Sequence, residues 1–317
     1  MERFIEKDEL PSSLWNEEED SLLLPPIAVS SWISLLETNS LYELAESKAP
    51  KGFEGGVSEE DTNKHLAWRY NGSCGRILLS MLDPHNKLPS VSDAYAKIFS
   101  GNKVFLADLP SGSGAAVITI LTTLAELRCK SCLPRIPLTV VVVAGEISES
   151  ARKYVVSQID SIRVNLEEQA IWVEYDVVDW DVCDPINSTD LIRKMTIKSN
   201  DCDSRMLVVS NFSGLLESNG KWKDAKPQLD EIFRHSRDDN STAIWIEPQR
   251  NNVPIFLDRL VSWFVKLFRE ILPAGVSREA TDWYAKDDAK IKQPIKDGYY
   301  PVRLSVVRFE LPIKGEE

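Results

Sequence analysis

Apolar positions in the first hundred residues follow a helical period. Their spacing predicts helices over 27–48 and 60–100. In the second segment one face is apolar, formed by Leu66, Tyr70, Ile77, Leu78 and Met81. Gly72 and Gly75 interrupt this segment, which indicates a break in the helix or a close approach to another backbone or a ligand.

The pattern changes after residue 100. Short apolar segments rich in β-branched residues predict five buried strands, over 104–107, 138–144, 171–178, 206–210 and 242–247. Helical segments lie between them, through Arg128, from Glu149, and near 188–198 and 223–237. This alternation predicts an α/β fold, with a mostly parallel sheet, right-handed crossovers and helices on both faces.

The last part of the chain differs again. Apolar residues from Phe256 to Ile271 predict an amphipathic helix. Residues 300–311 alternate between apolar and polar, as in a strand with one solvated face. We expect this strand to be antiparallel, to pair with a strand near 282–285, and to complete a seven-stranded sheet.

These patterns divide the chain into three parts. Residues 1–26 are acidic and end in Pro25-Pro26, and we expect a flexible arm, although Leu22 to Leu24 offer apolar side chains for docking. Residues 27–100 form a helical N-terminal region, which we expect to be a lid or the substrate side of the site, with Asn63 to Arg76 as part of the lid. Residues 101–317 form the α/β domain.

Charge and hydropathy narrow the choice of partners. The chain has 317 residues and a net charge of −12, which repels phosphate backbones, so we do not expect a nucleic-acid partner. No apolar run approaches the roughly 20 residues that cross a bilayer, and the charged N-terminus lacks the apolar stretch of a signal peptide. We therefore expect a soluble, cytoplasmic protein.

The five cysteines predict no metal site. Cys129 and Cys132 have the spacing of metal ligands, but no second pair or nearby His completes a four-ligand set. Free thiols at a helix end are the simpler interpretation. An odd number of cysteines fits a reducing compartment.

A glycine-containing turn carries the candidate chemistry. The first strand ends at Asp108, the turn Leu-Pro-Ser-Gly112-Ser-Gly114 follows, and a helix starts at once. Glycines let a ligand lie against the backbone, and the N–H groups of a helix start favour a carboxylate or a phosphate. A P-loop would need a Lys here, and a dinucleotide site would need a small residue in place of Val117.

The same turn resembles the first motif of class I, Rossmann-like S-adenosylmethionine-dependent methyltransferases, an acidic residue followed by x-G-x-G. The segment Val143-Ala-Gly-Glu146-Ile147-Ser148 resembles the second motif of that family. The resemblance implies that Glu146 accepts hydrogen bonds from both ribose hydroxyls of S-adenosylmethionine, since one carboxylate can accept two.

The resemblance extends to the next two strands. Asp179, with the backbone N–H of Trp180, follows the third strand, where the family places an acidic or amide residue against the adenine amino group. Asp181 is the alternative. Asn211 follows the fourth strand, either as a turn residue or as a substrate contact. The implied cofactor site consists of Asp108, Pro110, Ser111, Gly112, Gly114, Glu146, Ile147, Asp179, Trp180 and Asn211.

The sequence identifies no catalytic residue. Asn211 lacks the Pro-Pro-Tyr of amino-methylating nucleic-acid enzymes, and His65, His85 and His235 are candidate bases by residue type only. We expect a methyltransferase that acts on a small molecule or a protein. The alternative is a methyltransferase-like, non-catalytic subunit that serves as a binding module, with a protein partner at the N-terminal region.

Overall fold

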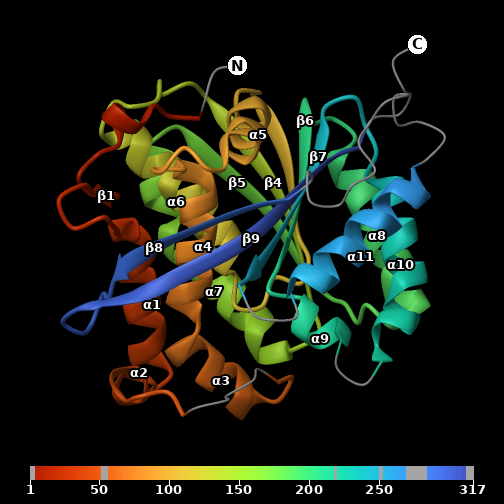
Figure 1. Ribbon diagram of the computed structural model, residues 1–317, viewed down its shortest axis with the longest axis horizontal. Helices are drawn as coiled ribbons and strands as arrows, with labels where there is room; N and C mark the ends of the chain where they lie inside the picture. The colour runs from red at the N-terminus through yellow and green to blue at the C-terminus, as the bar shows by residue number, and fades with distance from the viewer. Residues whose placement is uncertain (1–3, 51–55, 218–219, 250–252, 269–283, 312–317) are drawn as a thin grey trace.

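A mixed nine-stranded sheet forms the centre of the molecule, in the order β1-β2-β8-β9-β7-β6-β3-β4-β5 (Figure 1). The computed structural model describes residues 4–50, 56–217, 220–249, 253–268 and 284–311. The parallel part of the sheet consists of β3 (Lys103–Asp108), β4 (Leu138–Glu146), β5 (Ile171–Asp179), β6 (Ser204–Ser210) and β7 (Ser241–Pro248). The order β5-β4-β3-β6-β7 is that of a Rossmann-like fold, in which β3 and β6 flank the point where the chain reverses direction.

The other edge of the sheet confirms one expectation and corrects another. As expected, the strand β9 (Tyr299–Glu310) is antiparallel to β7, and it forms a hairpin with β8 (Tyr284–Lys292). The sheet has nine strands rather than seven, because β1 (Trp15–Asn16) and β2 (Ser21–Leu22) add to the edge at β8. The sheet as a whole is therefore mixed rather than mostly parallel.

Helices cover both faces of the sheet, as the alternation predicted (Figure 1). On one face lie α1 (Pro26–Thr38), α4 (Tyr70–Leu82), α5 (Pro89–Phe99), α6 (Ala115–Cys129) and α7 (Glu149–Glu168). On the other lie α8 (Pro185–Ser199), α9 (Ser213–Glu217), α10 (Trp222–His235) and α11 (Val253–Leu267). Alternate residues of β3 enter the two cores: Leu106 faces the first and Phe105 the second. Ile271, the last apolar position of the predicted helix, and its expected end near Pro273 lie outside the described residues.

The N-terminal region breaks at different places from those predicted. The first predicted helix is divided into α1 and α2 (Tyr42–Glu46), and the second into α3 (Glu59–Trp68), α4 and α5. The break between α3 and α4 falls at Arg69, and both glycines lie inside α4. Gly75 permits a close approach, because a Cβ there would lie 2.9 Å from Ile291 Cδ1 and from Val302 Cγ2.

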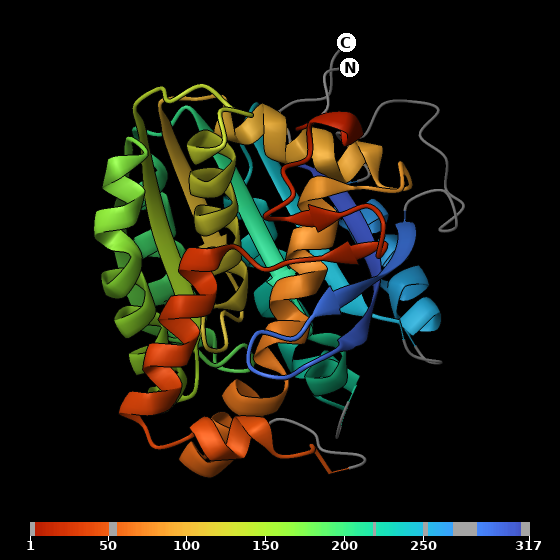
Figure 2. The ribbon, with the colours of Figure 1, turned by 90° about the vertical axis from the view of Figure 1, so that its left-hand side faces the viewer.

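The acidic arm is part of the fold over its described residues, which corrects the expectation of a flexible segment. A short 3₁₀ helix (Lys7–Glu9) precedes β1 and β2. Of these two strands, β2 pairs with β8 and β1 lies on the outer side of β2 (Figure 2). Leu14 and Leu22 are fully buried. His85 also holds the arm, since its Nε2 lies 2.9 Å from Asp20 Oδ1 and its Nδ1 lies 2.8 Å from Asp287 Oδ2.

No helix within the described part of the chain is long and apolar enough to cross a membrane.

Candidate functional site

The carboxyl ends of the parallel strands meet at one edge of the sheet, where open α/β sheets bind ligands. Asp108, Glu146 and Asp179 are the last residues of β3, β4 and β5. Asn211 directly follows β6 on the other side of β3. The predicted acidic residues therefore lie at the carboxyl ends of three adjacent strands, and Asn211 lies on the opposite side of β3 from Glu146 and Asp179.

The glycine-containing turn lies between β3 and α6 and is held against β4. Ser111 N–H donates to the carbonyl of Gly145 at 2.9 Å. Gly112 and Gly114 have φ of +51° and +86°, a conformation that side chains rarely adopt. At Gly112 the position of a Cβ is open: apart from the adjacent residues, no described atom lies within 4 Å. The turn thus leaves space against its backbone at Gly112.

Glu146 connects the turn to the end of β4. Its Oε2 accepts a hydrogen bond from Gly112 N–H at 3.0 Å, and its Oε1 accepts one from Ser148 N–H at 2.9 Å. Burial raises the pKa of this carboxyl, and these N–H donors oppose the rise. Each carboxylate oxygen has a second lone pair, so Glu146 retains capacity for further donors.

Asp108 is buried beneath the turn. Its Oδ2 accepts from Val117 N–H at 3.3 Å, and its Oδ1 has no hydrogen-bond partner among the described residues. Burial raises the pKa of Asp108 to about 8, and the nearby Glu146 carboxyl adds to the rise. Asp108 is therefore mainly protonated at pH 7, so it can donate a hydrogen bond from its carboxyl group.

The predicted adenine side is arranged differently from the expectation. The backbone N–H of Trp180 donates to the Glu146 carbonyl at 3.3 Å, and the Trp180 ring packs in the core against Phe212. Asp179 is exposed and forms an ion pair with Arg152 at 2.8 Å. The Trp180 N–H is therefore committed to the sheet, and Asp179 is held by a cation.

Ile147 remains an apolar surface beside these groups. Its side chain is 38% exposed, directly after Glu146. Arg152 Nη1 also donates to the carbonyls of Glu146 and Ile147, both at 2.7 Å, and so fixes the backbone from which Ile147 projects. An exposed, rigid aliphatic side chain of this kind suits contact with a planar apolar ring.

The N-terminal helices cover the edge next to the turn. Thr62 of α3 shares a hydrogen bond with Ser148 at 2.8 Å. Tyr70 Oη donates to Gln158 Oε1 at 2.7 Å, and Gln158 Nε2 donates to the carbonyl of Ser113 at 2.6 Å. Both Tyr70 and Gln158 are 1% exposed. The start of α4 is therefore tied to the glycine-containing turn through one buried amide.

Asn211 contacts the N-terminal helices rather than the turn. Its Oδ1 accepts from Arg76 Nε at 3.0 Å, and its Nδ2 donates to Ser73 Oγ at 3.2 Å. Arg76 Nη2 donates to the same Ser73 hydroxyl at 3.2 Å. Asn211 has φ of +57°, as expected of a turn residue. Sequence reasoning missed the contacts of Arg76 and Ser73 with Asn211, because more than 130 residues separate them from Asn211.

Glu247, also missed, organises the loop after β6 from the end of β7. Its Oε1 accepts from the N–H groups of Phe212 and Ser213 at 2.9 and 2.8 Å, and from Trp245 Nε1 at 2.7 Å. Its Oε2 accepts from Ser213 Oγ at 2.7 Å. Burial raises the pKa of Glu247, whereas these donors oppose the rise. A side chain 1% exposed and bound by four donors has a structural role.

The three histidines differ in their surroundings. His85 forms the carboxylate network of the arm, and His235 is largely exposed near Glu231. His65 lies in α3, where burial and then the charges of Arg76 and Arg69 lower its pKa to about 4. His65 is therefore neutral at pH 7.

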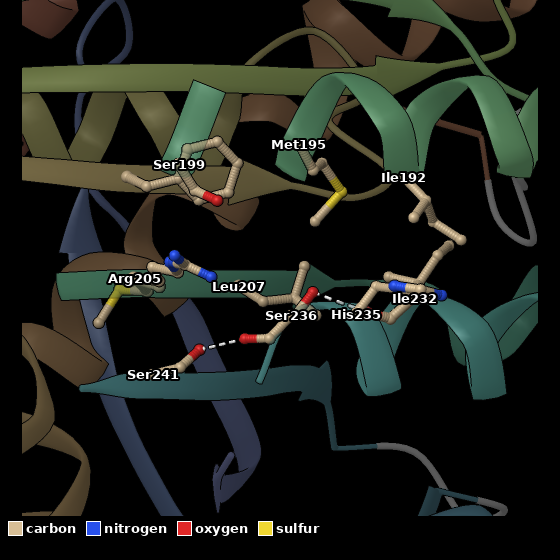
Figure 3. A pocket seen from close by; sticks show the side chains of 11 residues that line it. Ile192, Met195, Ser199, Arg205, Leu207, Ile232, His235, Ser236 and Ser241 are labelled. Atoms are coloured by element: carbon tan, nitrogen blue, oxygen red, sulfur yellow. Dashed lines mark hydrogen bonds between the residues drawn. The ribbon is translucent and has the colours of Figure 1, made fainter. Parts of the chain in front are cut away.

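Two other hollows do not contribute to this site. A cavity of about 10 Å³ lies between α8, α10 and the amino-terminal ends of β6 and β7, and it has room for about one water (Figure 3). A shallow groove along α7 and Val177 touches the site only through Arg152. Within the described ranges, no cluster of three or more His, Cys, Asp or Glu side chains is placed to hold a metal ion.

Comparison with known proteins adds little. No family model and no curated protein matches the chain. One similar structure is that of the glycopeptide N-methyltransferase MtfA with sinefungin, at 11% identity, 70% coverage of each chain and a TM-score of 0.28. Another concerns the conversion of a disulfide bond into a thioacetal group during echinomycin biosynthesis, at 13% identity, 70% and 80% coverage and a TM-score of 0.34. Likenesses this weak carry no argument about activity.

Proposed function

We propose that the protein is an S-adenosylmethionine-dependent methyltransferase that acts on a small-molecule or protein acceptor. The observation that carries the proposal is the open space at Gly112, bordered by a glutamate that is bound to the Gly112 N–H. A turn with a glycine open on its side-chain position, a carboxylate at the end of the next strand and an exposed aliphatic residue suit a nucleoside with an attached chain.

The residues present fit that cofactor. Glu146 would hold the ribose hydroxyls through its remaining lone pairs, and Ile147 would lie against the adenine ring. The turn at Pro110, Ser111, Gly112 and Gly114 would border the methionine part, with Asp108 beneath it. Asp179 is held in an ion pair by Arg152. The Trp180 N–H already donates to the Glu146 carbonyl, so we assign it no part in recognition of the adenine.

The chemistry asks little of the protein beyond alignment. When bound, the cofactor supplies an activated methyl group, which an acceptor takes in an in-line displacement. Helices α3 and α4 would exclude water from this edge of the sheet, and Asn211 is held rigid by Arg76 and Ser73. His65 is neutral at pH 7, and its lowered pKa makes it a weak base, so we assign it no part in proton transfer.

Calorimetric titration with S-adenosylmethionine tests the site through a side chain in the open space. Asn tolerates a positive φ better than other side chains, so Gly112→Asn fills the space with little strain. Gly220→Asn is the matched control, because Gly220 has φ of +71° and nothing described within 4 Å. We expect the affinity to fall by about tenfold or more in Gly112→Asn and to be unchanged in Gly220→Asn. Equal affinities in both variants would refute the placement.

Turnover separates the enzyme from a binding module. Release of S-adenosylhomocysteine when cell extract is supplied as the acceptor source would support the enzyme. Cofactor binding without release, together with a protein retained on the N-terminal region, would support the module instead. We also propose the cytoplasm as the location, which fractionation of a tagged protein would test.

A further inference from the structure

A second group of polar side chains gathers on the far side of β3 from Glu146. Arg76 is fixed at its Nε by Asn211 and at its Nη2 by Ser73, so its guanidinium has a defined orientation. Because Asn211 also donates to Ser73, the three side chains form a closed triangle of hydrogen bonds. A guanidinium fixed in this way is preorganised for a planar or tetrahedral oxyanion.

Tyr300 contributes a hydroxyl beside this guanidinium. A Cβ at Gly72 would lie 3.8 Å from Arg76 Nη1 and 3.9 Å from Tyr300 Oη, so the two polar atoms approach the same point over α4. The Tyr300 hydroxyl is buried and has no hydrogen-bond partner among the described residues. A buried hydroxyl left without a partner is unfavourable, which points to a group that binds there.

Two arginines act on this region, although the whole chain carries a net charge of −12. At His65, burial lowers the pKa, and the Coulombic causes that add to it are Arg76 and Arg69. At Tyr300, burial raises the pKa, the nearby Cys74 adds to the rise, and Arg76 opposes it. Burial likewise raises the pKa of Cys74 to about 12, against the opposing charge of Arg76. The charge of Arg76 therefore reaches three neighbouring groups, although burial is the larger cause at each of them.

The order of the sheet places this group on the acceptor side. Glu146 ends β4, one strand to one side of β3 and its turn. Asn211 follows β6, one strand to the other side, and Tyr300 belongs to β9, two strands beyond β6. With neighbouring strands about 4.8 Å apart, Tyr300 lies well away from the ribose end of the site.

We propose that Arg76 and Tyr300 form a subsite for an oxyanion, a carboxylate or a phosphate, carried by the methyl acceptor. Arg76 Nη1 donates to one oxygen and Tyr300 Oη donates to another, while Asn211 and Ser73 keep the guanidinium in place. Anion binding follows from these residues alone. The assignment of the anion to the acceptor rests on the proposed function.

Titration of the protein with benzoate and, separately, with inorganic phosphate tests anion binding and distinguishes the two chemistries. The His65 ring signals, assigned by comparison with His65→Gln, report occupancy by NMR, because a bound anion offsets the arginine charges and raises the His65 pKa. We expect Arg76→Gln to weaken the preferred probe by about tenfold or more and Tyr300→Phe to weaken it by about threefold. Arg69→Gln is the control for charge alone and should change the affinity by less than about twofold.

Two results would overturn the subsite. One is no shift of the His65 signals with either probe at any concentration up to about 50 mM. The other is equal affinity in wild type and Tyr300→Phe, a variant that keeps every other contact even if Arg76→Gln fails to fold. Thermal unfolding of each variant confirms that a lost signal is not lost structure.

Competition with S-adenosylmethionine separates this proposal from the proposed function. Independent binding of probe and cofactor supports an acceptor subsite. Mutual exclusion would overturn that assignment, since the anion would then occupy the place of the cofactor's own carboxylate. If the probe binds in an Arg76-dependent way and S-adenosylmethionine does not bind at all, the proposed function fails while the anion site stands.

Discussion

Glu146 and Glu247 occupy equivalent places on the two sides of the sheet centre. Each stands near the carboxyl end of a parallel strand, and each accepts N–H groups from the loop that follows the neighbouring strand. Glu247 is 1% exposed and accepts from four donors, whereas Glu146 is 8% exposed and borders the open space at Gly112. Glu247 thus only stabilises the loop after β6, whereas Glu146 stabilises the turn after β3 and retains capacity to bind a ligand.

This comparison shows that a buried acid at a strand end is insufficient evidence for a ligand site. What distinguishes the two acids is their exposure and the number of donors that they accept from, four at Glu247 and two at Glu146. Both loops contain a glycine whose Cβ position is open, Gly112 beside Glu146 and Gly214 directly after Ser213. An open glycine by itself therefore does not mark a ligand site either.

The largest expected effect is on folding, at Glu247. Glu247→Ala leaves the N–H groups of Phe212 and Ser213 and the Trp245 indole buried without an acceptor. We expect the free energy of unfolding to fall by about 4 kcal/mol, measured by urea denaturation. Glu247→Gln keeps a carbonyl acceptor and should lose less. A loss below about 1 kcal/mol in Glu247→Ala would contradict the structural role.

Glu146→Ala should be less costly for folding. It removes two hydrogen bonds, to Gly112 and Ser148, in a place that water can reach more easily. We expect a loss of about 2 kcal/mol in the same denaturation experiment. If Glu146→Ala destabilised the protein as much as Glu247→Ala, the two glutamates would have the same structural role.

Asp108 should make stability depend on pH. Its ordinary pKa of 3.8 applies to the unfolded chain, whereas in the folded protein the pKa is about 8. The folded state therefore binds the extra proton between these values, and stability falls as pH rises from about 4 to about 8. Between pH 6 and pH 8 we expect wild type to lose about 2 kcal/mol of stability relative to Asp108→Asn. Parallel pH profiles of the two proteins would contradict the buried, protonated state.

The smallest effect is expected where the N-terminal helices meet the turn. Tyr70→Phe removes the donor to Gln158 and leaves the packing of the ring in place. We expect a loss of about 1 kcal/mol and faster hydrogen exchange over residues 62–76. In wild type, S-adenosylmethionine should slow exchange in the same residues. Exchange unaltered by the ligand would mean that these helices pack on the domain without covering the cofactor.

Periodicity predicted the strands well because each is buried and continuous in sequence. The run Val140 to Val143 is an example, since it is buried by both cores. The arm was predicted poorly because β1 and β2 have two residues each, too few for a period to appear. Their stability comes from pairing with β8 and from the His85 network, which are distant in sequence.

The site was predictable to the extent that it is local. Asp108, Gly112 and Glu146 lie in short motifs with recognisable spacing, and the structure brings them together. The contacts of Arg76, Tyr300 and Glu247 follow no such motif, because they join segments distant in sequence: α4, β9, β7 and the loop after β6. The glycines of α4 predicted either a break in the helix or a close approach. Gly75 corresponds to a close approach to Val302, and the helix is unbroken there.

The most direct test compares S-adenosylmethionine binding to Glu146→Gln and Glu247→Gln by calorimetry at one temperature where both are folded. The amide replaces one carboxylate oxygen by a donor in each variant, so the chemical change is matched. We expect about tenfold or greater loss of affinity in Glu146→Gln, from the weakened bonds to the ribose hydroxyls, and less than about twofold change in Glu247→Gln. Equal affinities in the two variants, or a larger loss in Glu247→Gln, would contradict a cofactor site at the ends of β3 and β4.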